Sequence, residues 1–275
     1  MTGSAATRDP MGGRARWSAA FLPGTPTLVP QLTGSSNRPD LDALRDACGA
    51  AVARMLGERP HVVVCVGAGT ATRRHDPSAR GTLAGFGVEV RTDAAGGAGD
   101  RTRGNAGDMA GDIADDAAVG DAVSLPPALT LARFMLSAAG WAGPVQLQEV
   151  SPTATAAECA RLAAALPVPG SGWLVVADGS TSRTARAPGG FDPRSGDFDG
   201  GVERALRAGD ATRLGQVDPG LALELGASGW APWQVLARAA PSSEIQATVD
   251  YADAPLGVGY LVGSWTADLE AGIGR

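Results

Sequence analysis

Hydrophobic and polar positions along the chain fall into alternating strand-like and helix-like blocks. Apolar or β-branched runs predict strands over 17–22, 61–66, 85–91, 145–150, 173–177, 245–250 and 258–265. Apolar residues at helical spacing predict helices over 40–56, 126–139, 153–166, 199–208, 219–227 and 233–240. Strands that alternate with helices indicate an α/β fold. We expect a single domain over 17–266, with a mostly parallel central sheet flanked by helices.

Two segments contain few large apolar side chains. Residues 1–16 are rich in Gly, Ala, Thr and Arg and lack the apolar run of a secretory signal, so we expect a disordered N-terminus. Residues 93–122 consist largely of Gly, Ala and Asp, and such a segment buries too little apolar surface to offset the entropy of ordering it. We expect a mobile loop there, either a tolerated insertion or a lid.

Composition and charge exclude several classes of protein. Hydrophobic residues make up 44% of the 275 positions, and no stretch reaches the roughly 18 apolar residues of a membrane helix. The formal net charge is -6 without a basic run, which disfavours binding to a phosphate backbone. Every cationic side chain is Arg, which excludes a Schiff-base or P-loop lysine. We therefore expect neither a nucleic-acid nor a membrane partner.

The cysteines and tryptophans are expected to lie in the core. Cys48, Cys65 and Cys159 are far apart in sequence and have apolar neighbours, which predicts buried reduced thiols in a cytoplasmic protein. The tryptophans occur in predicted strands, helices and apolar segments, so packing is their expected role.

Small and polar residues follow several of the predicted strands. Such residues stand at 23–25, at 67–70 and at 178–183, directly after three strands. Because ligands of open α/β sheets bind at the carboxyl ends of the strands, we expect a binding cleft there. Its candidate residues are Thr25, Asp178, Ser180, Arg183 and Asp253. An arginine would suit a carboxylate or phosphate. The alternative is that the polar residues of 178–183 only cap the end of their strand.

Other local patterns do not predict a known catalytic site. The glycines at 67–69 lack the third glycine of a dinucleotide fingerprint, so no cofactor is expected. Ser180 lacks the second glycine of a nucleophile elbow. We expect His61 at the amino end of its strand and His75 in an exposed, arginine-rich loop. Asp197 and Asp199 precede a predicted helix, where carboxylates cap the amino end and favour the helix dipole.

An ordered set of short motifs in the second half resembles one known family. The motifs are Asp178-Gly179-Ser180, Ala187-Pro188-Gly189, Asp197-Phe198-Asp199, Gly209-Asp210, Tyr251 and Ala254-Pro255-Leu256-Gly257-Val258-Gly259-Tyr260. Together with Pro23, Pro26 and Leu28-Val29-Pro30, they resemble the class III extradiol ring-opening dioxygenase subunit-B superfamily, which includes Memo-like proteins and an actinobacterial branch of unknown role. The resemblance extends over about residues 17 to 266.

The resemblance implies a scaffold without the iron site of the family. Family enzymes bind Fe(II) with two histidines and a glutamate and use a further histidine as acid/base, a ligand set that leaves positions open for substrate and dioxygen. The matching positions here are Gly24, the Gly67–Gly69 segment, Ala227 and Thr181, and the whole chain has only two histidines. We therefore expect neither Fe(II) nor ring cleavage.

Three functions are compatible with this sequence. The first is a metal-free protein whose cleft binds a small molecule or a protein partner. The second is an enzyme of different chemistry that uses Asp178, Ser180 and Arg183. The third is a structural or regulatory subunit, and a homo-oligomer is compatible with all three.

Overall fold

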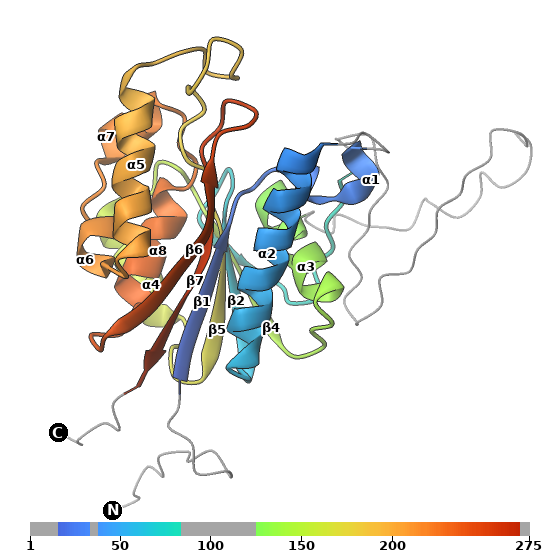
Figure 1. The fold of residues 1–275 in the computed structure, drawn as a ribbon. Helices are drawn as coiled ribbons and strands as arrows, with labels where there is room; N and C mark the ends of the chain where they lie inside the picture. Colours follow the sequence, from blue (N-terminus) through green and yellow to red (C-terminus); the bar gives the residue numbers. More distant parts are fainter. Residues whose placement is uncertain (1–15, 34–37, 84–124, 270–275) are drawn as a thin grey trace, which may run out of the picture.

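The computed structural model describes residues 16–33, 38–83 and 125–269 (Figure 1). Three expectations from the sequence fall outside these residues: the disordered N-terminus, except for Arg16 at the start of the first strand, the strand over 85–91 and the mobile loop over 93–122.

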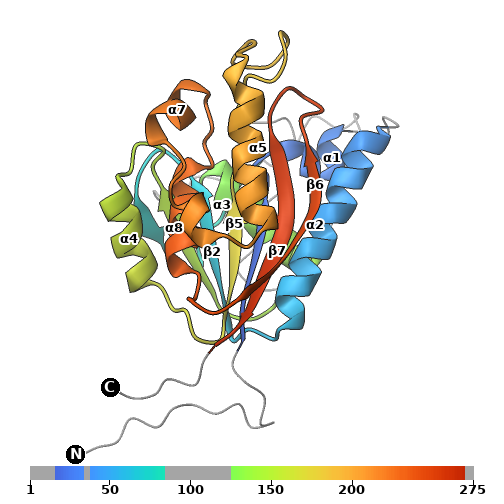
Figure 2. The ribbon, with the colours of Figure 1, turned by 60° about the vertical axis from the view of Figure 1, so that its left-hand side comes forward.

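Seven strands form one sheet, in the order β3-β4-β2-β5-β1-β7-β6. Their bounds are β1 (Arg16–Leu22), β2 (Val62–Ala68), β3 (Arg73–His75), β4 (Val145–Val150), β5 (Ser171–Val176), β6 (Ile245–Asp253) and β7 (Tyr260–Asp268). Helices flank the sheet on both faces, so the predicted α/β fold is confirmed (Figures 1 and 2).

The expectation of a mostly parallel sheet is only partly right. The central strands β4, β2, β5 and β1 are parallel, whereas β3, β7 and β6 each pair antiparallel with their neighbours. Sequence spacing explains the difference, because parallel pairing of consecutive strands needs a long crossover connection. Only short turns separate β2 from β3 and β6 from β7, so in both cases the chain reverses direction.

The helices form two layers that cover opposite faces of the sheet. The longest are α2 (Pro39–Gly57), α3 (Pro127–Ala138), α4 (Ala156–Ala165), α5 (Arg194–Arg207) and α8 (Trp230–Ala239); the short ones are η1 (Pro26–Leu28), α1 (Pro30–Thr33), α6 (Ala211–Leu214) and α7 (Pro219–Glu224). α2 and α3 pack on one face, while α4, α5 and α8 pack on the other (Figures 1 and 2). None of the helices in the described residues is long and apolar enough to cross a membrane.

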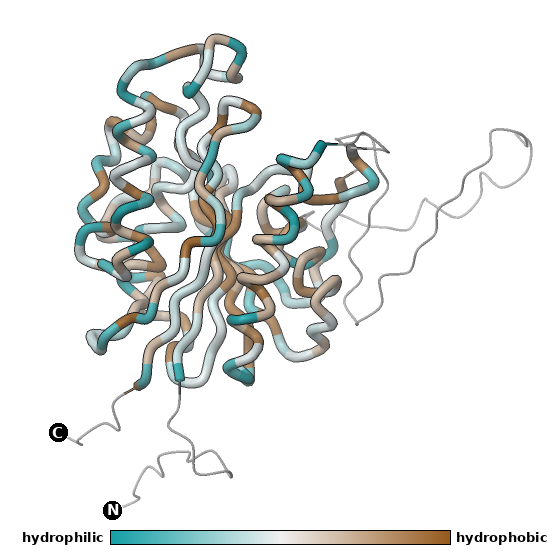
Figure 3. The backbone as a smooth tube through the Cα atoms, in the orientation of Figure 1, coloured by the Kyte–Doolittle hydropathy of each residue, from teal (hydrophilic) through white to brown (hydrophobic). Residues whose placement is uncertain are grey.

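Two hydrophobic cores result, one on each face of the sheet. Successive residues of a strand point to opposite faces, so Phe21 belongs to the core under α4, α5 and α8, and Leu22 to the core under α2 and α3. Hydrophobic positions accordingly gather along the central strands (Figure 3).

The predicted burial of the cysteines and of most tryptophans is confirmed. Cys48, Cys65 and Cys159 are free and buried. The buried tryptophans are Trp17, Trp173, Trp230, Trp233 and Trp265, while Trp141 is partly buried.

Candidate functional site

The carboxyl ends of the four parallel strands lie along one edge of the sheet. The helices that follow β1 and β2, which are α2 and α3, cover one face, whereas those that follow β4 and β5, which are α4 and α5, cover the other. Where the helices that follow two neighbouring strands lie on opposite faces of the sheet, the strands form a topological switch point. Open α/β sheets bind ligands at such points. By this criterion, switch points lie between β4 and β2, between β2 and β5, and between β5 and β1.

Asp178 lies at the switch point between β1 and β5. Its Oδ1 accepts a hydrogen bond from the backbone nitrogen of Gly24 at 2.8 Å. The residue is partly exposed, yet the protein atoms around its carboxyl remove enough hydration to raise the pKa of Asp178 to about 6, against the opposing effect of the Gly24 bond. A Cβ atom at Gly24 would lie 2.8 Å from Oδ2, so the glycine leaves room for this carboxyl group.

Two hydroxyl groups accompany Asp178. Thr25 is buried and caps η1, its Oγ1 accepting a hydrogen bond from the backbone nitrogen of Thr27. Burial raises the pKa of Tyr260, and a hydrogen bond with Thr25 and the charge of Asp178 act on the same phenol in opposite directions. The structure therefore brings together Thr25, Asp178 and Tyr260, of which sequence analysis named the first two. Tyr260 is the last residue of the motif over 254–260 and carries no separate signal in the sequence.

Ser180 and Arg183 form a separate cluster around Asp199. The two oxygens of Asp199 accept hydrogen bonds from the Ser180 nitrogen at 2.8 Å, from Ser180 Oγ at 2.7 Å and from Arg183 Nη1 at 3.1 Å. The exposed fraction of Asp199 is 3%, so this carboxylate ties the loop after β5 to α5. The structure thus favours the alternative in which these side chains cap the strand end.

The capping interpretation of Asp199 is wrong. Helix α5 begins at Arg194, five residues before the predicted start, and this places Asp197 in the first turn and Asp199 beyond it. The apolar pattern missed the early start because the first turn of α5 is mostly polar.

Asp253 lies apart from the other candidates. It ends β6, is exposed, and its Oδ1 accepts a hydrogen bond from the backbone nitrogen of Ala254 at 2.7 Å. This is a turn contact in the β6–β7 hairpin, and within the described residues no hydrogen bond or ion pair joins Asp253 to Asp178.

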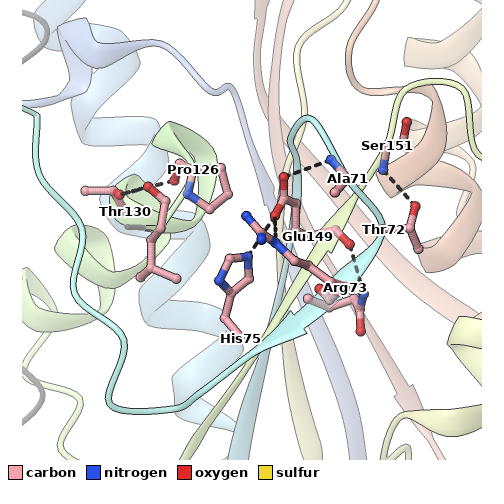
Figure 4. Close-up of polar contacts among 10 residues, drawn as sticks. Ala71, Thr72, Arg73, His75, Pro126, Thr130, Glu149 and Ser151 are labelled. Carbon is pink, nitrogen blue, oxygen red and sulfur yellow. Dashed lines mark hydrogen bonds and ion pairs between the residues drawn. The ribbon is translucent and has the colours of Figure 1, made fainter. Parts of the chain in front are cut away.

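A third polar cluster occupies the switch point between β2 and β4 (Figure 4). Glu149 of β4 has a side chain that is 1% exposed. Its Oε1 accepts a hydrogen bond from the Ala71 nitrogen at 3.0 Å, and its Oε2 lies 2.8 Å from both Arg73 Nε and His75 Nε2. Burial alone would raise the pKa of Glu149, but the hydrogen bonds from Arg73, His75 and Ala71 together lower it.

The prediction that His75 is exposed is wrong. Residues 73–75 form β3, which folds back antiparallel on β4 with Arg73 opposite Glu149 and His75 opposite Leu147. The side chain of His75 is therefore only 3% exposed. His61 directly precedes β2, at the amino end of the strand as expected, and is exposed. The cluster was not predicted, although Glu149, a charged residue within the predicted strand over 145–150, was a usable signal.

The positions that the resemblance would assign to iron ligands and to the acid/base histidine do not fit an Fe(II) site. A Cβ atom at Gly67 would lie 2.8 Å from Ala128 Cβ of α3, and one at Gly69 would overlap with the carboxylate of Glu149. Ala227 is buried, and Thr181 Oγ1 donates a hydrogen bond to the Leu225 carbonyl oxygen. Within the described residues, no group of three or more His, Cys, Asp and Glu side chains could hold a metal ion. Fe(II) needs nitrogen and carboxylate donors together.

Comparisons with known proteins give a likeness to solved structures alone. No family model and no curated protein matches the sequence. The fold is similar to that of the uncharacterized protein JW3007 from Escherichia coli K12, with a TM-score of 0.46 and 16% sequence identity, over 91% of this chain and 99% of that one. Neither residue roles nor an activity can be transferred at that distance.

Proposed function

We propose that this protein is an iron-independent relative of the class III extradiol dioxygenases, and that it binds a small hydroxyl-bearing molecule at the switch point between β1 and β5. The observation that carries the proposal is the carboxyl group of Asp178. It has a raised pKa of about 6, one oxygen that accepts a hydrogen bond from the Gly24 backbone nitrogen, and the phenol of Tyr260 nearby. A perturbed carboxyl group at a switch point is a candidate ligand contact.

The chemistry of the neighbouring side chains selects the class of ligand. Ionised Asp178 only accepts hydrogen bonds, and the hydroxyls of Thr25 and Tyr260 can donate or accept them. Arg183 belongs to the separate cluster around Asp199, so it supplies no cation for an anionic ligand at Asp178. A neutral molecule with neighbouring hydroxyl groups matches this arrangement, because its hydroxyls would donate to the carboxylate that burial leaves poorly hydrated.

Binding of catechol tests the proposal, with 1,2-dimethoxybenzene as a matched compound that has no hydroxyl to donate. We expect catechol to bind saturably, as measured by calorimetry, and the dimethoxy compound to bind at least about tenfold more weakly, because each donor to a charged acceptor contributes about 1.5–3 kcal/mol. Asp178→Asn should lose most of this preference. Asp253→Asn removes an exposed carboxylate at the hairpin and serves as the control.

Two results would contradict the proposal. One is equal binding of the two compounds to the wild-type protein. The other is stoichiometric Fe(II) in the pure protein together with ring cleavage of catechol, because the proposal assigns no iron to this site.

A second candidate function is acid–base catalysis by Asp178. Its raised pKa of about 6 supports this candidate, because a general acid or base is most effective when its pKa lies near the working pH. The enzyme that sequence analysis considered also used Ser180 and Arg183, but both side chains are engaged with Asp199. Turnover that is lost in Asp178→Asn and kept in Ser180→Ala would favour this candidate.

A further inference from the structure

Three charged or titratable side chains at the switch point between β2 and β4 share one face of the sheet. Arg73 is the antiparallel partner of Glu149, and His75 follows Arg73 by two residues on β3. Partners across a ladder and residues two apart in a strand point to the same face, here the face that α2 and α3 cover. Arg74 points to the opposite face, where its guanidinium reaches the Ala165 carbonyl oxygen of α4.

The hydrogen bonds of Glu149 define the tautomer of His75. Glu149 has a lowered pKa and accepts hydrogen bonds from Ala71 and Arg73, so it is a carboxylate and can only accept. His75 Nε2, at 2.8 Å from Glu149 Oε2, must therefore be the donor. In the neutral ring Nδ1 is then an acceptor, and within the described chain it has no hydrogen-bond partner.

Arg73 adds a partly exposed guanidinium group to the cluster of His75 and Glu149. Its side chain is 45% exposed, and its Nε donates to Glu149. In the described part of the chain the two terminal nitrogens of the guanidinium form no hydrogen bond. A terminal fork of this kind suits a carboxylate. The Cα atoms of residues two apart in a strand are separated by about 6–7 Å. A carboxylate bound by Arg73 and a hydroxyl group bound by His75 can therefore belong to one small molecule.

We propose that Arg73, His75 and Glu149 form a second ligand site, separate from that of Asp178, for a small organic acid that also carries a hydroxyl group. Arg73 binds the carboxylate of the ligand, and His75 Nδ1 accepts the hydrogen of its hydroxyl group. Glu149 is a positioning residue, because it orients the imidazole without contacting the ligand (Figure 4).

Nuclear magnetic resonance of the two histidines tests this site directly. The sequence has only two histidines, and the exposed His61 serves as an internal reference. Long-range ¹H–¹⁵N spectra should show His75 as the Nε2–H tautomer. Addition of 4-hydroxybutyrate should shift the Nδ1 resonance of His75 saturably and leave His61 unchanged. Butyrate, which has no hydroxyl group, and 4-hydroxybutanamide, which has no charge, should each bind at least about tenfold more weakly.

Matched variants separate the roles of the residues. Arg73→Gln should lower the affinity for 4-hydroxybutyrate at least about tenfold, whereas Arg74→Gln, on the opposite face of the same strand, should leave it unchanged. Glu149→Gln should let His75 populate both tautomers and weaken its response to the ligand.

Several results would overturn the proposal. They are an Nδ1–H tautomer in the wild-type protein, equal binding of butyrate and 4-hydroxybutyrate, or equal effects of Arg73→Gln and Arg74→Gln. The Asp178→Asn variant separates the two proposed sites. It should bind 4-hydroxybutyrate normally, and loss of that binding would place the acid at Asp178 and refute a second site.

Discussion

At the residue scale, the pKa values of two carboxyl groups at the same sheet edge shift in opposite directions, although burial acts to raise both. Asp178 has a hydrogen bond from the backbone of Gly24, and loss of hydration raises its pKa to about 6. Glu149 is more deeply buried, yet hydrogen bonds from Ala71, Arg73 and His75 lower its pKa. The donors around Glu149 outweigh its loss of hydration, whereas the single Gly24 donor of Asp178 does not.

The raised pKa of Asp178 predicts how its replacement changes stability with pH. A carboxyl group with a higher pKa in the folded state favours folding below its unfolded pKa, and this contribution is lost as the pH rises through about 6. Asp178→Asn, which stays neutral, should therefore raise the free energy of unfolding at pH 8 by about 1–3 kcal/mol. The gain should disappear towards pH 4. Urea unfolding of both proteins at several pH values measures it, and a gain that grows towards acid would contradict the assignment.

Ser180 provides a second prediction at this scale. Its Oγ donates to Asp199 at 2.7 Å, and both residues are buried. Ser180→Ala leaves the Asp199 carboxylate with one donor fewer, so the free energy of unfolding should fall by about 1–3 kcal/mol. Binding of catechol at Asp178 should not change, because Ser180 belongs to a different cluster. Calorimetry of the variant measures both quantities, and loss of binding without loss of stability would return Ser180 to the ligand site.

At the scale of elements, the apolar pattern predicted most helices and strands but not the contacts that fix their ends. Helix α4 shows the difference. The pattern located the helix, but the start was expected at 153, whereas Thr155 is the cap and forms a capping box with Glu158. That signal is local and readable. The early start of α5 and the short strand β3 have no such signal in the apolar pattern. At the start of α5, Ser195 Oγ donates hydrogen bonds to the carbonyl oxygens of Ser182 and Asp192. Strand β3 pairs with β4, where Arg73 lies opposite Glu149, 76 positions away.

For the candidate site, too, the sequence predicted local positions but not the contacts between distant residues. The position of Asp178 followed from its place after a strand, which is a local property. The grouping of Ser180 and Arg183 with Asp199, and of His75 with Glu149, depends on contacts over 16 to 74 positions. No pattern in one sequence specifies which of many polar residues meet at such separations.

Glycines of two elements give a prediction with an internal control. In β2, a Cβ atom at Gly67 would lie 2.8 Å from Ala128 Cβ, so α3 or the strand must shift. Gly67→Ala should therefore lower the free energy of unfolding by about 1–3 kcal/mol. In α2, a Cβ atom at Gly49 would meet nothing within 4 Å. Gly49→Ala should raise the free energy of unfolding by about 0.5–1 kcal/mol through helix propensity. Thermal unfolding of the two variants should show Tm changes of opposite sign.

At the scale of the whole molecule, the sheet separates two hydrophobic cores that share every central strand. Successive residues of a strand such as Phe21 and Leu22 belong to different cores. Removal of the helices from one face would therefore expose the strands that also form the core on the other face. This coupling predicts that the two cores unfold together as one cooperative unit, although each has its own helices.

The buried thiols allow this coupling to be measured, because they report on different cores. Cys159 belongs to the core under α4, α5 and α8, whereas Cys65 belongs to the core under α2 and α3. Burial raises the pKa of Cys65 to about 12 and also raises that of Cys159, so neither thiol should react in the folded state. In two variants that each keep one of these cysteines, with the other two replaced by alanine, both thiols should react with a disulfide reagent at the rate of global unfolding. A Cys159 that reacts much faster than Cys65, at matched stability of the two variants, would show that the face carrying α4 and α8 opens by itself.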